Sequence, residues 1–198
     1  MMDNKSALRD IVIQNRSYRR FDEATTIELS VLRELVDLAR LSGSSGNNQP
    51  LKYILSNTPE TNCTVFSCLA WAASLSDWDG PVEGERPSGY IVILGDTEIA
   101  KGFGFGFGVD HGIASQSILL GATERGLGGC MIGSVKRKQL AEDLNIPSRY
   151  EILLVLALGK PAELVVLDQV KDNITSYWRD EKDIHHVPKR SLDEIILQ

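Results

Sequence analysis

Apolar residues recur along this chain with two spacings, one typical of amphipathic helices and the other of buried strands. Helical spacing predicts helices at 7–13, 25–42, 58–73, 110–125 and 134–144. Short apolar runs predict strands at 53–55, 90–94 and 152–158, while 130–132 fits either a strand or an extended loop. Because helices and strands are mixed without strict alternation, the pattern predicts an α+β fold rather than a doubly wound parallel sheet.

Residues that favour helix ends mark several of these boundaries. Thr25 and Glu28 form a capping-box pattern for the second helix. Thr58 precedes a proline, which is the arrangement of an N-cap followed by proline at the first helical position. We expect Ser134 to cap the helix that ends near Leu144.

The length of the chain suits one domain, and we expect 1–198 to form it. The stretch 163–188 is polar, with Tyr177 and Trp178 isolated in it. A long arm that carries aromatic side chains needs a surface to pack on, and a second subunit is the simplest candidate. We therefore expect 163–198 to be a C-terminal arm that contributes to a homodimer. We expect the central helix at 110–125, which is rich in small residues, to contribute to the same interface.

Composition narrows the class of protein. A hydrophobic content of 42% allows a buried core, so no disordered class fits. The formal net charge is −6 and no long basic run accompanies aromatic residues, which disfavours binding to nucleic acid or to an anionic membrane. The start of the chain leads into no apolar signal core, and no segment approaches about 18 uninterrupted apolar residues. We therefore expect a soluble, cytoplasmic protein.

Candidate nucleophiles and metal ligands are few. Cys63, Cys68 and Cys130 are odd in number and lack metal-ligand spacing, which indicates reduced thiols rather than a disulfide framework or a zinc site. His185 and His186 are adjacent, so their side chains diverge in an extended segment and metal ligation is not expected. No Ser-His-Asp or Cys-His arrangement follows from the spacing, and we expect neither a catalytic side chain nor a metal.

Basic side chains cluster near both ends of this acidic chain. Arg16, Arg19 and Arg20 lie close together, with Ser17 among them. A planar guanidinium group can bind phosphate oxygens through two hydrogen bonds, and a nearby hydroxyl or backbone amide completes such a site. The second cluster, 189–190, directly precedes a capping-box pattern. We expect the fold to bring both clusters to one small anion; solvated surface charge is the alternative.

Two further segments suit a flat heterocycle. The loop at 44–50 holds hydroxyl and carboxamide groups, which can hydrogen-bond carbonyl and imide edges or form an Asx-rich turn. Glycines at 126–133 allow the backbone to approach a ligand closely, or simply turn from helix to strand. The alternating glycines and phenylalanines at 102–108 lack the spacing of a dinucleotide-binding loop. They indicate either an aromatic-lined segment near a cleft or a loop with core phenylalanines.

Four segments, in order, resemble the nitroreductase family of flavin mononucleotide (FMN) enzymes over nearly the whole chain: 16–21, 44–50, 126–133 and 187–190. The resemblance implies an α+β homodimer whose central antiparallel sheet is flanked by helices and completed by a C-terminal strand from the partner subunit, with two flavins at the interface. It also implies FMN as the cofactor and NADH or NADPH as the electron donor. Electrons would pass by ping-pong hydride transfer to an electron-poor acceptor such as a nitroaromatic or a quinone.

The resemblance also assigns cofactor-binding positions. The phosphate, ribityl chain and pyrimidine edge of the flavin would be held by Arg16, Ser17 and Arg19, and the phosphate would be covered by Lys189 and Arg190. Side chains that reach the flavin from the other subunit would be Ser44, Ser45, Asn47 and Gln49. The backbone facing the reactive N5 edge would be that of Met131, Ile132 and Gly133.

This chain departs from the family pattern at several places. Many relatives carry arginine where Asn15 stands, so the phosphate affinity of this chain can differ from theirs. Many also carry tryptophan where Leu51 stands, so the wall of the flavin pocket near 44–50 can differ as well. The long helical insertion that covers the flavin in larger members is missing. Candidates for a pocket cover are Trp71, Trp78 and the phenylalanines at 103–107, with core burial as the alternative for at least half of them.

Other functions fit the same residues. A relative with this fold could carry out reductive dehalogenation or consume the flavin itself. A flavin-binding protein could store, sense or modify FMN without a donor. A phosphate-binding globular protein without flavin is the simplest alternative.

Overall fold

The computed structural model describes residues 5–72, 75, 78–101 and 107–197. The helices are α1 (Lys5–Gln14), α2 (Leu29–Leu41), the 3-10 helix η1 (Ser45–Asn47), α3 (Pro59–Ser67), α4 (Gly108–Glu124), α5 (Arg137–Asp143) and α6 (Leu192–Ile195). The strands are β1 (Phe21–Asp22), β2 (Leu51–Ser56), β3 (Gly89–Asp96), β4 (Gly128–Ile132), β5 (Tyr150–Pro161), β6 (Val165–Gln169), β7 (Trp178–Arg179) and β8 (His185–Lys189).

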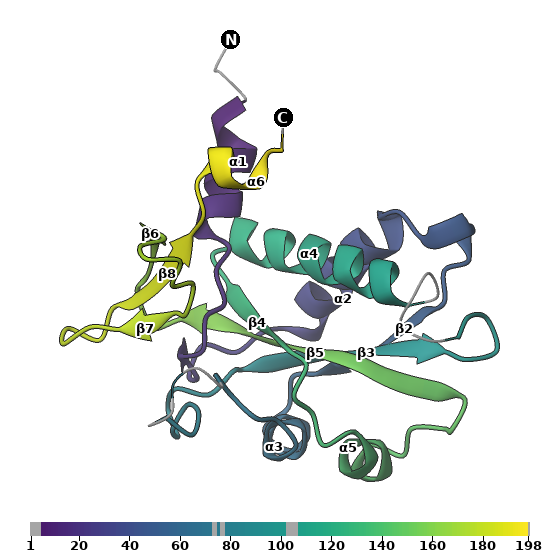
Figure 1. Ribbon diagram of the computed structural model, residues 1–198. Helices are drawn as coiled ribbons and strands as arrows, with labels where there is room; N and C mark the ends of the chain where they lie inside the picture. The colour runs from purple at the N-terminus through teal and green to yellow at the C-terminus, as the bar shows by residue number, and fades with distance from the viewer. Residues whose placement is uncertain (1–4, 73–74, 76–77, 102–106, 198) are drawn as a thin grey trace.

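The long strand β5 is the centre of a five-stranded antiparallel sheet (Figure 1). It pairs with β3, β4 and β1, and β3 pairs in turn with β2. The segment 130–132, which fitted either a strand or a loop, is part of β4. The predicted α+β class with a central antiparallel sheet is therefore confirmed.

Helices cover both faces of this sheet. In Figure 1, α2 and α4 lie on one face and α3 and α5 on the other. Every residue of β3 is buried, so its alternating side chains enter two separate cores. Ile91 and Ile93 join the core that contains α2 and α4, whereas Tyr90 and Val92 join the core that contains α3 and α5.

The predicted start of the second helix is wrong. The helix α2 begins at Leu29, so Thr25 does not cap it. The Thr25 hydroxyl donates instead to Asp22 at 2.7 Å, in the turn that follows β1. A threonine side chain can stabilise a local turn as readily as a helix end, and here the nearer aspartate is the acceptor.

The ends of two further helices differ from the predicted ends, and both differences have the same cause. The helix α3 ends at Ser67 rather than near 73, and α5 begins at Arg137 with Lys136, not Ser134, at its N-cap. The backbone N–H of Ala70 donates to the carbonyl of Ser134 at 3.0 Å. Both segments are therefore held extended against each other, which removes them from the adjoining helices.

The C-terminal arm forms a small sheet of its own, with strand order β6-β8-β7. The strand β8 is parallel to β6 and antiparallel to β7. The capping box predicted for the last helix is confirmed, since the Ser191 N–H donates to Glu194 Oε2 at 2.8 Å. Exchange of 163–198 between subunits stays a prediction.

Candidate functional site

A cavity of about 300 Å³ opens where the segment after α1 meets α4, β4 and β8. It contains five of the predicted cofactor residues: Arg16, Ser17, Arg19, Met131 and Lys189. The other lining residues are Asn15, Gln116, Leu119, Tyr177, His185 and Val187. The fold therefore brings residues from both ends of the chain to one place, and no acidic residue is among the described residues that line it.

Arg16 is the side chain best suited to receive an anion in this cavity. One terminal nitrogen, Nη2, donates to the Val12 carbonyl at 2.7 Å, while Nε is buried without a hydrogen-bond partner among the described residues. Partial burial lowers the pKa of Arg16 from its usual value. A buried guanidinium N–H without an acceptor is costly, so an oxygen ligand at Nε would stabilise the site.

Arg19 lines the cavity but is largely buried in its wall. It is only 8% exposed, its Nη1 donates to the Ser17 carbonyl at 3.2 Å, and its guanidinium lies 4.6 Å from the centroid of the Tyr177 ring. The same nitrogen lies 3.2 Å from Nε2 of His185. These contacts fix the orientation of Arg19 and make it a rigid part of the wall.

His185 is a site residue that the sequence analysis did not assign. Because a guanidinium group only donates, Nε2 of His185 accepts from Arg19 and Nδ1 carries the ring proton. That Nδ1 is buried and has no partner within the described part of the chain. Burial, followed by the charge of Arg19, lowers the pKa of His185 to about 4, so the ring is neutral at neutral pH.

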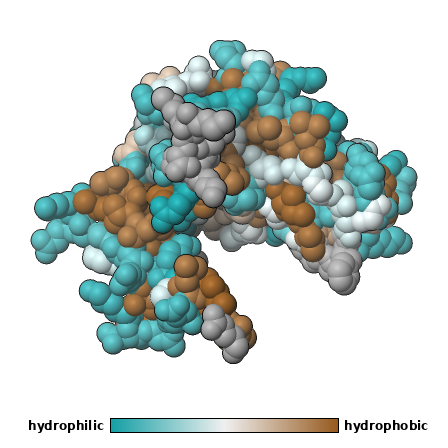
Figure 2. Space-filling model, turned by 90° about the horizontal axis from the view of Figure 1, so that it is seen from above, coloured by the Kyte–Doolittle hydropathy of each residue, from teal (hydrophilic) through white to brown (hydrophobic). Residues whose placement is uncertain are grey.

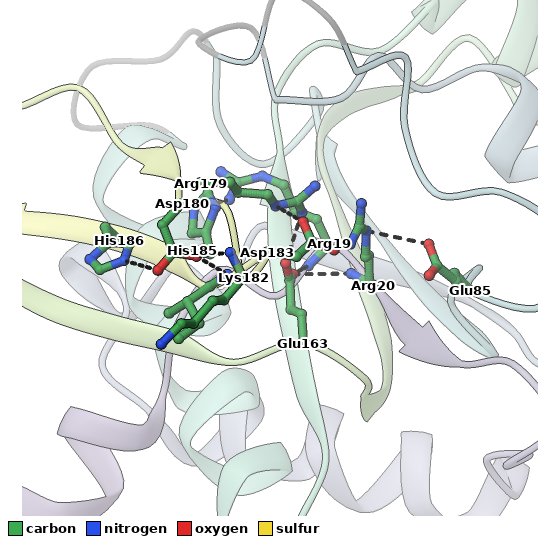
Figure 3. A network of polar contacts seen from close by, with 11 residues as sticks. Arg19, Arg20, Glu85, Glu163, Arg179, Asp180, Lys182, Asp183, His185 and His186 are labelled. Carbon is green, nitrogen blue, oxygen red and sulfur yellow. Dashed lines mark hydrogen bonds and ion pairs between the residues drawn. The ribbon is translucent and has the colours of Figure 1, made fainter.

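A buried carboxylate holds the arm against the segment that carries the arginines. Glu163 accepts hydrogen bonds from the backbone N–H groups of Arg19 and Arg20, the latter at 3.1 Å, and pairs with Arg179 at 2.8 Å (Figure 3). Its side chain is 2% exposed. Arg20 also reaches out to Asp183 and Glu85, so the arm is docked by several charged contacts.

The adjacent histidine faces the other side of the arm. His186 Nδ1 lies 2.7 Å from Asp168 and its Nε2 lies 3.4 Å from Asp180, while its ring stacks on Trp178 at 4.1 Å. The hydrogen bond to Asp168 is the main cause that raises the pKa of His186. The predicted divergence of His185 and His186 along an extended strand is confirmed.

The hydroxyl-rich loop lies at a different cavity, of about 290 Å³, lined by Ser44, Gln49, Tyr53 and Asp110 among others. The buried Asp110 accepts from the Ser44 hydroxyl and, at 2.8 Å, from the backbone N–H of Ser45. Asn47 and Gln49 have positive φ angles of 53° and 52° and exposed side chains. A single chain therefore does not bring this loop to Arg16; its contact with a flavin of the other subunit stays a prediction.

The remaining predicted positions are divided between the cavity and its surroundings. Met131 is 38% exposed and lines the cavity, whereas Ile132 is 4% exposed and packs in the core with α3 and α5. Gly133 follows β4 and is exposed. Arg190 is not among the residues that line the cavity, and its Nη1 lies 3.4 Å from Glu194 on α6.

The aromatic residues that were candidates for a pocket cover lie in different parts of the fold. Trp71 is buried in the core with α3 and α5, and Phe107 is fully buried in the opposite core. Trp78 packs against the guanidinium group of Arg179, at 4.7 Å. The phenylalanines at 103 and 105 lie outside the described residues, and neither tryptophan lines the Arg16 cavity.

The described residues give little support for a reactive thiol, a metal site or a membrane-spanning helix. Cys63, Cys68 and Cys130 are unpaired, and burial raises the pKa of the Cys130 thiol, which opposes thiolate formation. No group of three or more potential ligands is placed to hold a metal ion in the described part of the chain. Over the same residues, no helix has the length and apolar character needed to cross a bilayer.

Comparison with known proteins places this geometry in context. Residues 91–160 match the model of the nitroreductase family. Among solved structures, a nitroreductase family protein from Clostridium novyi NT is 21% identical, covering 94% of this chain and 97% of that one, with a TM-score of 0.65. An FMN-dependent nitroreductase from Clostridium difficile R20291 is 23% identical, covering 77% and 87%, with a TM-score of 0.62.

A third similar structure is an NADPH:FMN oxidoreductase from Vibrio harveyi, solved with NAD⁺ and 21% identical to this chain. The match covers 79% of this chain and 69% of that one, with a TM-score of 0.63. At these identities the structural matches establish the fold. Together with the match over 91–160, they confirm the resemblance of this chain to the nitroreductase family that the four sequence segments predicted.

Proposed function

We propose that this protein is an FMN-dependent oxidoreductase that takes electrons from NADH or NADPH and passes them to an electron-poor acceptor such as a nitroaromatic or a quinone. The cavity at Arg16 carries this proposal. Within the described part of the chain, it combines an arginine whose buried N–H has no partner, a second arginine fixed in the wall, and Lys189 from the arm, and no acidic residue lines it. Such a donor set fits a phosphate group joined to a polar, flat heterocycle.

The residues of this cavity would bind and orient the cofactor rather than react. We assign Arg16 and Lys189 to the phosphate, Ser17 to the ribityl chain and Arg19 to the pyrimidine edge. The backbone at 131–133 would border the reactive edge of the ring. When bound, FMN supplies the hydride chemistry, and the positive charge of the cavity favours negative charge that develops on the ring.

The proposed assembly is a homodimer of the single domain 1–198, in which the arm 163–198 contacts the partner and the loop at 44–49 completes the partner's site. This loop supports the assembly because its exposed polar groups lie away from the Arg16 cavity of their own chain. A second subunit would bring them to it.

An anaerobic visible spectrum tests the proposed function. The purified protein is loaded with FMN, freed of excess cofactor, and titrated with NADH and separately with NADPH. We expect flavin absorption bands that bleach with at least one donor and return on addition of a quinone. Bands that persist with both donors would indicate a flavin-storing, flavin-sensing or flavin-modifying protein. A protein that retains no FMN would contradict the cofactor assignment.

A further inference from the structure

A third, smaller cavity of about 160 Å³ lies between α3, the turn that follows β1 and the segment that leads into β3. Its walls share no residue with the Arg16 cavity. The lining residues are Glu23, Thr26, Asn57, Pro59, Asn62, Cys63, Phe66, Arg86, Pro87, Ser88 and Tyr90. The proposed FMN site makes no use of this cavity.

Two hydrogen-bond donors line this cavity without an acceptor. Ser88 is 6% exposed, and its buried Oγ has no partner among the described residues. The buried Nε of Arg86 likewise has none. The Arg86 guanidinium lies 4.7 Å from the centroid of the Phe66 ring and makes no ion pair with an acid of the described chain. An arginine that is stacked but unpaired keeps its charge available for a ligand.

The neighbouring polar groups are already engaged. Glu23 Oε2 accepts from the backbone N–H groups of Gly84 at 2.6 Å and Arg86 at 3.3 Å. Asn62 donates from Nδ2 to the Ser88 carbonyl at 2.9 Å and accepts from the Ser56 hydroxyl at 2.7 Å. Among the described lining residues, Arg86 Nε and Ser88 Oγ are the buried side-chain atoms without a hydrogen-bond partner, and a carboxylate or another oxyanion would satisfy both.

The rest of the lining is apolar and limits the size of an occupant. The ring of Phe66 and the prolines Pro59 and Pro87 offer carbon surface beside the two donors. A cavity of about 150 Å³ accepts a benzene ring, so this one holds a body of that size. Hydrated inorganic anions gain little from such a surface, whereas a carboxylate attached to an apolar ring matches both parts.

We propose that this cavity binds a small monocarboxylate with an apolar body, whose carboxylate accepts hydrogen bonds from Arg86 and Ser88 while its ring packs against Phe66. The site is independent of the flavin site. It therefore provides a place where an aromatic or short aliphatic acid binds whether or not FMN is present.

Cys63 supplies a reporter for occupancy because it lines the same cavity and is exposed. The other two thiols are buried, with Cys68 1% and Cys130 4% exposed. The full-length protein is alkylated with uncharged N-ethylmaleimide, and the modified residue is identified by peptide mass mapping. We expect benzoate to slow alkylation of Cys63 severalfold in a saturable manner, and the neutral isostere benzamide to have no such effect.

Variants test whether Arg86 and Ser88 are responsible for the protection by benzoate. Arg86→Gln should raise the benzoate concentration for half-protection about tenfold or more, as expected for loss of one charge-assisted hydrogen bond, and Ser88→Ala by a smaller factor. The matched control Arg33→Gln removes the same charge from an exposed position of α2 and should leave protection unchanged. Circular dichroism checks that each variant is folded.

Several results would overturn the assignment. These are equal protection by benzoate and benzamide, protection that survives in both Arg86→Gln and Ser88→Ala, or no protection at all. Equal protection by inorganic phosphate would show an oxyanion site without the apolar component. The flavin spectrum is recorded on the same samples, so failure here is separate from failure of the FMN assignment.

Discussion

Three neighbouring arginines have quite different surroundings in the fold. Arg16 keeps a buried N–H unpartnered beside the cavity, and Arg19 is enclosed by Tyr177 and the neutral ring of His185. Arg20 forms ion pairs with Asp183 on the arm and with Glu85. The same side-chain chemistry therefore serves ligand recognition, wall rigidity and docking of the arm, and substitutions at the three positions should have different effects.

Substitution of Arg16 should affect the cofactor first. We expect Arg16→Ala to weaken FMN binding by about 1.5–3 kcal/mol, the range of a hydrogen bond to a charged group, with little change in unfolding free energy. Fluorescence titration of FMN measures the affinity. Arg33→Ala, which removes an exposed charge from α2, is the matched control and should bind normally. Arg190→Ala should have a smaller effect than Arg16→Ala because Arg190 reaches Glu194. Normal affinity in Arg16→Ala would contradict the assignment.

The two adjacent histidines should respond to pH in opposite directions. His185 stays neutral in the fold, whereas the unfolded chain takes up a proton below about pH 6.5, so its contribution to stability falls by at most about 3 kcal/mol between pH 6.5 and about 4. The pKa of His186 is raised, so its contribution is complete below about pH 6.5 and is lost as the pH rises through its folded-state value.

Urea unfolding at about pH 5 and about pH 7.5 separates these contributions. The destabilisation caused by His185→Gln should be smaller at the lower pH, and that caused by His186→Gln should be larger there. Each variant is compared with the unmodified protein at the same pH, which cancels the titration of groups elsewhere. Parallel pH dependence of the two variants would contradict the opposite environments.

At the scale of elements, one buried carboxylate is the most enclosed of the charged contacts that dock the arm. Glu163 joins the arm to the segment 19–20 and is the nearer of the two acids that pair with Arg179 on β7, at 2.8 Å against 3.9 Å for Asp183. Removing one partner of a buried ion pair leaves the other uncompensated. We expect Glu163→Ala to lower the unfolding free energy by about 3–5 kcal/mol and to expose the arm to limited proteolysis.

An exposed pair provides the control for Glu163. Asp37 and Arg40 form an ion pair on the surface of α2, and Asp37→Ala should cost at most about 1 kcal/mol. Glu163→Gln, which keeps a hydrogen-bond acceptor for the backbone, should lie between the two. Equal, small losses in Glu163→Ala and Asp37→Ala would show that the arm is held mainly by other contacts.

The elements were predictable where a periodic pattern dominates. The continuous apolar run in β5 and the helical spacing in α2 and α4 identified the central sheet and the helices of one face. Helix ends were less predictable, because contacts with distant segments decide them. The backbone pairing of Ala70 with Ser134 shortens two helices, and nothing local to either segment indicates it. In the arm, β7 and β8 are short and carry no clear alternation of apolar and polar residues. The strand β6 does contain an apolar run, 165–167, which the polar character assigned to 163–188 overlooked.

The residues of the candidate site divide in the same way, into those that local sequence indicates and those whose roles depend on distant contacts. Arginine and serine near the start and lysine near the end were identifiable from their chemistry, and the fold brings Arg16, Ser17 and Lys189 together. His185 and Asp110 were missed because their roles depend on partners far away in the sequence, Arg19 and Ser44. The available signal for Asp110 was an acidic residue in the first turn of a helix that is otherwise mostly apolar.

For the whole molecule, the main unexplained feature is apolar surface around α1, the end of α2 and α6. Leu8 is 64% exposed, Leu41 66% and Leu192 69%. Figure 2, which views the molecule from the side where α1 and α6 lie in Figure 1, shows hydrophobic surface there. Exposed apolar residues grouped in this way are typical of a subunit interface.

The proposed homodimer can be tested at this surface. We expect the protein to sediment as a dimer, and Leu41→Glu to shift it towards monomer because a charge would be buried at the interface. FMN affinity should fall with the dimer, since the loop at 44–49 would no longer reach the partner's cavity. Val82→Glu, at a loop position 63% exposed, is the control and should leave both properties unchanged. A monomeric parent protein that binds FMN tightly would refute the dimer and show that one chain completes the site.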